Sequence, residues 1–187
     1  MQRITNVELG EFLKDFKERS VTTVLEEGRE KDEIIKIAKA KGILLKDSKD
    51  LAGFKTVYAF TDRPNRNGAI LPKAKLLKAL PTLVGKPIDI DHNRRYVVGF
   101  YIDYRYIANK NMVIAYGIFF KNSFADEWET VKEKFKNKSL ATSFEIWSPK
   151  DKYKYHTDGT YELAEMEVAG GAILFDTTPA FKDAKVL

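Results

Sequence analysis

Two histidines occur among the 187 residues, and their settings differ. His92 ends the segment PIDIDH, where a strand gives way to a loop, whereas His156 lies in the polar turn YHTDGTY. A solvated turn residue is the expected role of His156, so His92 is the candidate for chemistry. The chain has no cysteine, which excludes thiolate metal sites and a cysteine nucleophile. A serine activated by a histidine is therefore the simplest nucleophilic centre that the composition allows.

Three serines follow the long helix predicted over 123–137 and compete for the role of nucleophile. Ser139 is placed to close a helix, and Ser148 precedes a proline in an ordinary turn. Ser143 lies inside the apolar segment ATSFEIW, where a hydroxyl is less expected. From spacing alone, a strand serine satisfied by the backbone and a nucleophile are equally compatible with Ser143.

A metal site is the alternative chemistry. Asp89, Asp91 and His92 together offer oxygen and imidazole ligands of the kind that a metal-dependent nuclease uses. In a continuous strand, however, Asp89 and Asp91 share one face and His92 points to the other. This cluster is therefore a weaker signal than the histidine–serine pair.

The elements that must position these residues follow from the hydrophobic pattern. Apolar residues at helical spacing predict helices over 7–19, 30–41 and 123–137, and Pro72 begins a short helix in PKAKLLKAL. Alternating or continuous apolar runs predict strands over 54–60, 86–92, 96–106, 112–120, 140–147 and 161–175. Many short strands with a few interleaved helices predict an α+β fold with an antiparallel, partly closed, barrel-like sheet.

Charge and composition divide the chain near residue 50. Residues 1–50 carry 11 basic and 11 acidic side chains, whereas the whole chain has a net charge of +5. We therefore expect 1–50 to be a helical accessory segment or pro-segment and 51–187 to be the main domain. The excess positive charge forms no dense stripe, so no specific nucleic acid is expected as a partner. No apolar run approaches the roughly 20 residues that span a bilayer, and no secretory signal is present, so we expect an intracellular protein without a membrane partner.

Three blocks of the chain stand out when they are taken in order. The first is NRNGAILPKAKLLKALPTLVGKPIDIDH, the second is KSLATSFEIW and the third is YELAEMEVAGGAILFDTTPAFKDA. Together they resemble the tailed-phage prohead serine proteases, which are distantly similar to the herpesvirus assemblins. The first block is similar to the family's Asn-x-Asn-Gly turn, short helix, Leu-x-Gly-Lys-Pro and strand ending in the catalytic histidine; the second resembles the nucleophile strand, and the third the closing strand and its Pro-Ala. The resemblance covers about residues 54–184 and implies an assemblin-like fold.

The resemblance maps the general base onto His92 and the nucleophile onto Ser143. Members of the superfamily place a third catalytic side chain just before the closing apolar triplet, where this chain has Gly170 or Gly171. Glu167 is the nearest carboxylate on the same strand, and we take it as the expected third member.

The register of the closing strand leaves the third member open. A regular ladder about a two-residue turn at Asp158 and Gly159 would set Ser143 opposite Leu174, several residues from Glu167. The other candidate carboxylates are Glu165, Asp89, Asp91 and Asp176.

The function implied by the resemblance is a serine endopeptidase that cleaves scaffold and major capsid proteins during phage prohead maturation. It would use no cofactor, could self-associate, and would act in the host cytoplasm inside the assembling prohead. A catalytically weak or inactive capsid- or scaffold-binding module of the same fold is the main alternative, because a glycine stands at the expected third position. A metal-dependent nuclease is the lesser one.

Overall fold

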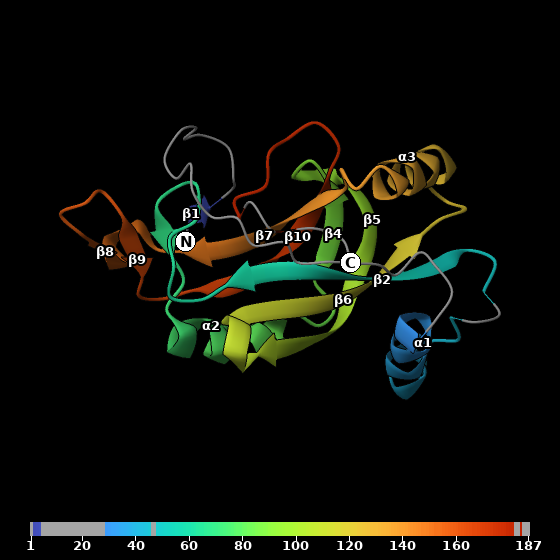
Figure 1. Cartoon of the computed structure of the whole chain (residues 1–187), viewed down its shortest axis with the longest axis horizontal. Coiled ribbons are helices and arrows are strands. Elements are labelled where there is room, and N and C mark those ends of the chain that lie inside the picture. Colours follow the sequence, from blue (N-terminus) through green and yellow to red (C-terminus); the bar gives the residue numbers. More distant parts are fainter. Residues whose placement is uncertain (1, 5–28, 46–47, 182–183, 185–187) are drawn as a thin grey trace.

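The computed structural model describes residues 2–4, 29–45, 48–181 and 184, and these form an α+β fold (Figure 1). A seven-stranded sheet curls into a half-barrel, and a small three-stranded sheet extends from one end of it. None of the described helices is both long enough and apolar enough to cross a membrane.

The helices are α1 Arg29–Ala40, α2 Lys73–Ala79 and α3 Ala125–Lys136, with the 3-10 turns Leu80–Leu83, Ala108–Lys110 and Lys150–Lys152. The strands are β1 Gln2–Ile4, β2 Leu51–Phe60, β3 Ala69–Ile70, β4 Pro87–Ile90, β5 Asn93–Ile107, β6 Met112–Phe120, β7 Ala141–Ser148, β8 Tyr153–Tyr155, β9 Tyr161–Leu163 and β10 Glu167–Leu174.

The large sheet is mixed, which corrects the predicted antiparallel sheet. Its strand order is β1-β7-β10-β4-β5-β6-β2, and β10 pairs with β4 in parallel while its other neighbour, β7, is antiparallel to it. β10 lies between β7 and β4, and these two neighbours run in opposite directions, so one of its pairings is antiparallel and the other parallel. The small sheet, β3-β9-β8, also contains a parallel pair, β3 with β9.

Side chains from β2 close the half-barrel against β7 and β10. Thr56 and Thr142 are joined by a hydrogen bond between their hydroxyls. Tyr58 donates a hydrogen bond of 2.7 Å to the carbonyl of Gly170. The rings of Tyr58, Tyr101 and Phe144 are fully or almost fully buried in the interior, where Tyr58 packs edge-on against the other two. These contacts fix how strongly the sheet curls and therefore how β10 faces its neighbours.

The predicted helices lie close to the observed ones where the structure describes them. The predicted helix over 7–19 lies outside the described residues. The helix predicted over 30–41 is α1, and it buries Ile34 and Ala38 in the main core. The helix predicted over 123–137 is α3, which buries Val131. The division of the chain near residue 50 stays a prediction.

The segment predicted as one strand over 161–175 is two strands. Glu162 lies in β9, which pairs with β8 across the turn that contains Asp158, whereas β10 returns to the large sheet. The register of β10 on β7 is therefore independent of that turn, and Ser143 lies opposite Ala172 rather than Leu174.

Candidate functional site

His92 lies in a two-residue hairpin turn between β4 and β5. Ile90 pairs with Asn93, and the two residues between them, Asp91 and His92, have φ angles of 49° and 65°. Two successive left-handed residues are the conformation of a type I′ turn, which connects antiparallel strands with the correct twist. Asp and His tolerate this region better than most residues that carry a Cβ. Strand alternation therefore ends at Ile90, and His92 is not forced to the face opposite Asp89.

Asp91 anchors this turn to the end of β10. Its Oδ1 accepts a hydrogen bond of 2.9 Å from the backbone N–H of Phe175 and another of 2.9 Å from the hydroxyl of Thr177. The backbone N–H of Asp91 donates to the carbonyl of Ile173 at 3.0 Å. Asp91 thus holds the loop after β10 and does not join Asp89 and His92, contrary to the predicted cluster.

The imidazole of His92 contacts a buried carboxylate. Its Nδ1 lies 3.0 Å from Oε1 of Glu145, and the two side chains are 6% and 0% exposed. An ionised carboxylate can only accept hydrogen bonds, so this contact places a proton on Nδ1. In the neutral ring, Nε2 is then the basic nitrogen, as a general base requires.

A guanidinium joins Glu145 to a second buried carboxylate. Arg94 Nη2 contacts Oε2 of Glu145, and Nη1 lies 3.4 Å from Oδ2 of Asp89, which is also completely buried. Nη2 further donates 2.9 Å to the carbonyl of Ala169. Buried carboxylates are costly unless they are paired. Arg94 and His92 therefore supply the partners that let both acids lie inside the molecule.

Ser143 lies on the same face of the sheet as these groups. Ser143, Ala172 and Asp89 form one row across β7, β10 and β4, and Glu145 lies opposite Gly170 in the next row of that face. Residues directly opposite each other share a face, as do residues two apart on one strand. The side chains of Ser143, Glu145 and Asp89 therefore lie on the face where β10 presents only two small residues, Gly170 and Ala172.

The hydroxyl of Ser143 is directed to the backbone in this structure. Its Oγ donates to the carbonyl of Phe144 at 3.3 Å, and the residue is 2% exposed. Within the described part of the chain, no hydrogen bond joins Ser143 to His92. The structure therefore brings His92 to Glu145, and places Ser143 two residues along the same strand face.

The carboxylates expected from the sequence lie elsewhere. Glu167 begins β10 opposite Trp147, and its half-exposed carboxylate is 3.4 Å from Nζ of Lys86. Glu165 is 61% exposed, and Asp176 is an exposed residue of the loop that Asp91 holds. The carboxylate on His92 comes instead from Glu145.

Glu145 and Arg94 were missed by the sequence argument, although each carried a signal. Glu145 is the one charged residue in the otherwise apolar segment ATSFEIW. A charge in a strand that reads as buried implies a nearby partner of opposite sign. Arg94, two residues after His92, is such a partner.

The two glycines at the expected third position leave room for neighbouring side chains. Gly170 has a φ of +146°, and an added Cβ would lie 2.7 Å from both terminal nitrogens of Arg94. At Gly171 an added Cβ would lie 2.3 Å from the hydroxyl of Tyr101. Where the resembling family carries a side chain, this protein has the guanidinium of Arg94.

Asp89, His92 and Glu145 are also the described residues best placed to hold a metal ion. One ligand atom from each lies within 4.8 Å of the other two. Arg94, however, contacts both carboxylates. A divalent cation at this position would lie beside the guanidinium charge and compete with it for the same oxygens, so the donor set fits a cation poorly while Arg94 is in place.

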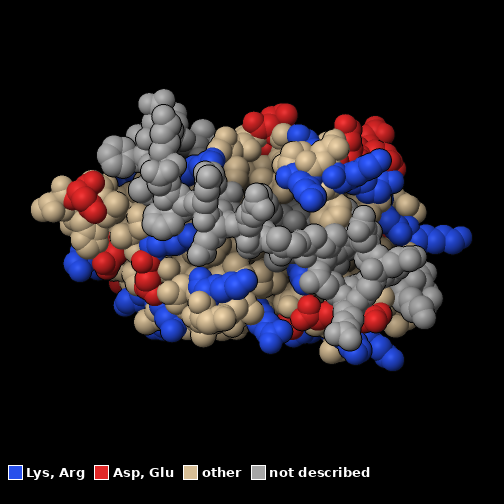
Figure 2. All heavy atoms as spheres, viewed as in Figure 1, with Lys and Arg blue, Asp and Glu red and all other residues tan. Residues whose placement is uncertain are grey.

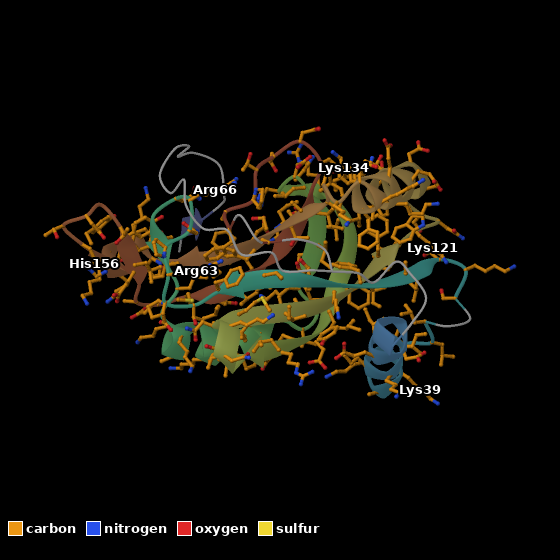
Figure 3. All side chains as sticks on the ribbon, in the orientation of Figure 1. Lys39, Arg63, Arg66, Lys121, Lys134 and His156 are labelled. Atoms are coloured by element: carbon orange, nitrogen blue, oxygen red, sulfur yellow. The ribbon has the colours of Figure 1, made fainter. Side chains whose placement is uncertain are left out.

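The remaining candidates occupy structural positions. His156 lies at the end of the molecule formed by β8 and β9, where its Nε2 is 3.2 Å from Oε1 of Glu162 (Figure 3). Ser139 donates 3.2 Å to the carbonyl of Lys134, and Ser148 donates 2.6 Å to the carbonyl of Glu165. Where Figure 2 shows described residues, Lys and Arg are interspersed with acidic side chains.

Comparison with protein-family models gives no match for this chain. The curated proteins likewise include none that matches it. The site is therefore interpreted from its own geometry.

Proposed function

We propose that this protein is a serine endopeptidase of the prohead type, with Ser143 as nucleophile, His92 as general base and Glu145 as the carboxylate that orients His92. The observation that carries the proposal is the 3.0 Å contact between His92 Nδ1 and Glu145 Oε1, on the strand face that also presents Ser143. An assemblin-like fold and a location inside the assembling prohead belong to the same proposal and rest on the sequence resemblance. Scaffold and major capsid proteins are the proposed substrates.

The chemistry follows from the tautomer that Glu145 selects. His92 Nε2 takes the proton of Ser143 Oγ as this oxygen attacks the scissile carbonyl, and it returns the proton to the leaving amine. The carboxylate stabilises the imidazolium that forms in between. Water then attacks the acyl-enzyme while His92 takes its proton, and the released Ser143 oxygen regains a proton from His92.

Two changes must accompany catalysis. The Ser143 hydroxyl has to rotate from the carbonyl of Phe144 toward His92. The buried site also has to admit a peptide, because Ser143 is 2% exposed. Hydrogen bonds at catalytic serines are often long or misaligned before substrate binds.

The direct test is covalent labelling of the full chain with a fluorophosphonate, followed by peptide mass mapping. We expect the label on Ser143, and we expect Ser143→Ala to abolish both labelling and hydrolysis of scaffold-derived peptides. Ser148→Ala is the matched control, because Ser148 is buried on the same strand and donates to a backbone carbonyl. Labelling or turnover that persists in Ser143→Ala would overturn the proposal.

A metal-dependent hydrolase is the second candidate, favoured by the grouping of Asp89, His92 and Glu145. Hydrolysis of peptides and of nucleic acid should be measured with EDTA and with added Mn²⁺ or Zn²⁺. The serine mechanism predicts turnover that EDTA leaves unchanged. Turnover that requires the metal and survives Ser143→Ala would favour the metal enzyme.

The non-enzymatic alternative has its own signature. A capsid- or scaffold-binding module would bind scaffold protein without cleaving it, and Ser143→Ala would bind equally well. Absence of both labelling and turnover, together with retained scaffold binding, would establish that alternative.

A further inference from the structure

Arg94 connects the two buried carboxylates and the turn that carries His92. It follows His92 by two residues at the start of β5, and its guanidinium reaches across β4 to the bulged part of β10. Nη1 approaches Asp89 at 3.4 Å, and Nη2 contacts Glu145 and donates to the carbonyl of Ala169. One rigid group therefore contacts three neighbouring strands beside the histidine.

The backbone of β10 is shaped to receive this group. The register of β10 shifts between Val168 and Gly170, and Gly170 takes a φ of +146°, which L side chains rarely adopt. An added Cβ would also meet the carbonyl of Pro87 at 2.5 Å. Tyr58 holds the bulge from the other side through the 2.7 Å hydrogen bond to the Gly170 carbonyl. A β-bulge of this kind bends the strand and changes the direction of neighbouring side chains.

We infer that Arg94 is a positioning residue that holds the Glu145 carboxylate so that Oε1 faces Nδ1 of His92. The two oxygens of Glu145 have different partners: Oε2 contacts Arg94 and Oε1 contacts His92. A planar guanidinium can fix the plane of a carboxylate as well as its charge, which a lysine ammonium cannot do. The guanidinium fills the space where a Gly170 side chain would lie, and Glu145 supplies the carboxylate that contacts His92.

The effect on turnover rests on the proposed protease function, but the positioning itself does not. Without the guanidinium, Glu145 and Asp89 would be two buried carboxylates beside one imidazole. The Glu145 carboxylate would then be free to rotate, and the Nδ1 hydrogen bond would lose its fixed partner. Misplacement of a catalytic group by about 1 Å can cost on the order of 100-fold in rate.

The primary measurement is the proton NMR signal of the His92 Nδ1–H in the full chain, which a strong hydrogen bond to a carboxylate moves to low field. It should be recorded in the Ser143→Ala background, so that catalysis does not contribute. We expect the signal in the parent, its loss in Arg94→Gln, and a broadened signal in Arg94→Lys. Arg95→Gln is the matched control, because Arg95 is the exposed neighbour with the same charge.

The second measurement is steady-state peptide hydrolysis with Ser143 intact. Arg94→Lys should lower kcat by about 10- to 100-fold with little change in KM, since the charge is kept and the geometry is lost. Guanidinium ions should partly restore kcat to Arg94→Ala and should not affect Arg95→Ala. Thermal melting identifies any variant that fails to fold. If Arg94→Gln or Arg94→Ala does not fold, the positioning role is judged from Arg94→Lys, which keeps the charge.

The outcomes separate this inference from the proposed function. An Nδ1–H signal that is the same in Arg94→Lys, Arg94→Gln and parent would overturn the positioning role, whatever the activity. Turnover that is independent of Ser143 would overturn the protease proposal while the NMR result still tests Arg94. Equal kcat and equal NMR signals in Arg94→Lys and wild type would assign Arg94 a purely structural role.

Discussion

Glu145 uses each of its carboxylate oxygens for a different purpose. Oε1 accepts from His92 and Oε2 contacts Arg94, and the side chain has no exposure to solvent. In its ionised form the carboxylate can accept from both partners at once. The identity of this one residue therefore determines whether His92 has the tautomer of a base.

Glu145→Gln should abolish most of the proposed activity while leaving the fold intact. The amide has one carbonyl oxygen and an NH₂ group that cannot accept the Nδ1 proton or pair with Arg94. In a serine protease triad, the corresponding carboxylate-to-amide change lowers kcat by about 10⁴-fold. The measurement is kcat for peptide hydrolysis, with circular dichroism as a check on folding.

Glu167→Gln is the control for this prediction. Its half-exposed carboxylate contacts Lys86, and exposed ion pairs contribute little. We expect activity close to wild type. A larger loss in Glu167→Gln than in Glu145→Gln would instead make Glu167 the third member, as the sequence predicts.

At the scale of elements, local pattern located most of the longer strands but not their neighbours in the sheet. The segments predicted over 112–120 and 140–147 are β6 and β7; β6 has the predicted bounds, and those of β7 are shifted by one residue. The place of β10 between β7 and β4 could not be predicted, because it depends on pairings between distant segments. The turn at Asp91 and His92 was also missed, since type I′ turns are usually signalled by a glycine.

Gly171 connects the interior of the half-barrel to the site, and its substitution should be costly. An alanine Cβ would lie 2.3 Å from the Tyr101 hydroxyl and 2.8 Å from the backbone carbonyl of Ser143, which cannot move away easily. Overpacking in a core costs typically about 1–3 kcal/mol. We expect Gly171→Ala to lower the free energy of unfolding by this amount in urea denaturation.

The double variant Gly171→Ala with Tyr101→Phe locates the source of this cost. The buried hydroxyl of Tyr101 has no hydrogen-bond partner among the described residues, and burial, followed by the charge of Asp89, raises the pKa of this hydroxyl far above its usual value. Tyr101→Phe alone should therefore cost little. In the double variant we expect part of the stability to return; strict additivity of the two changes would show that the hydroxyl is not the obstacle.

At the scale of the whole molecule, α1 is tied to the large sheet through Glu33. Its carboxylate accepts a 3.0 Å hydrogen bond from the hydroxyl of Tyr116 on β6, and it lies 3.8 Å from Nζ of Lys55 on β2. Burial, followed by this hydrogen bond, raises the pKa of Tyr116 to about 12. The docking of α1 is therefore coupled to the protonation of one tyrosine.

This coupling predicts a loss of stability at alkaline pH. A tyrosine whose pKa is raised in the folded state contributes stability that is complete below its unfolded pKa of about 10. That contribution declines above pH 10 and is lost as the pH passes the folded value near 12. We expect the free energy of unfolding to fall over this window, and to fall less in Tyr116→Phe. An identical pH dependence in both proteins would contradict the coupling.

Removal of residues 1–51 tests how far the N-terminal part belongs to the core. The sequence predicts an accessory segment, so a chain that begins at Ala52 should fold, but α1 buries Ile34 and Ala38 completely or nearly so. Burial of an isoleucine side chain contributes about 1.5–3 kcal/mol, and 1 kcal/mol corresponds to roughly 2–4 °C in a domain of this size. We therefore expect the shortened chain to fold with a Tm lower by at least several degrees.

Ile34→Ala in the full chain is the matched comparison, because it removes a buried side chain of α1 and keeps the rest of the segment. A shortened chain with an unchanged Tm would mean that α1 contributes nothing to stability, whereas one that does not fold would make residues 1–51 part of the core and move the domain boundary.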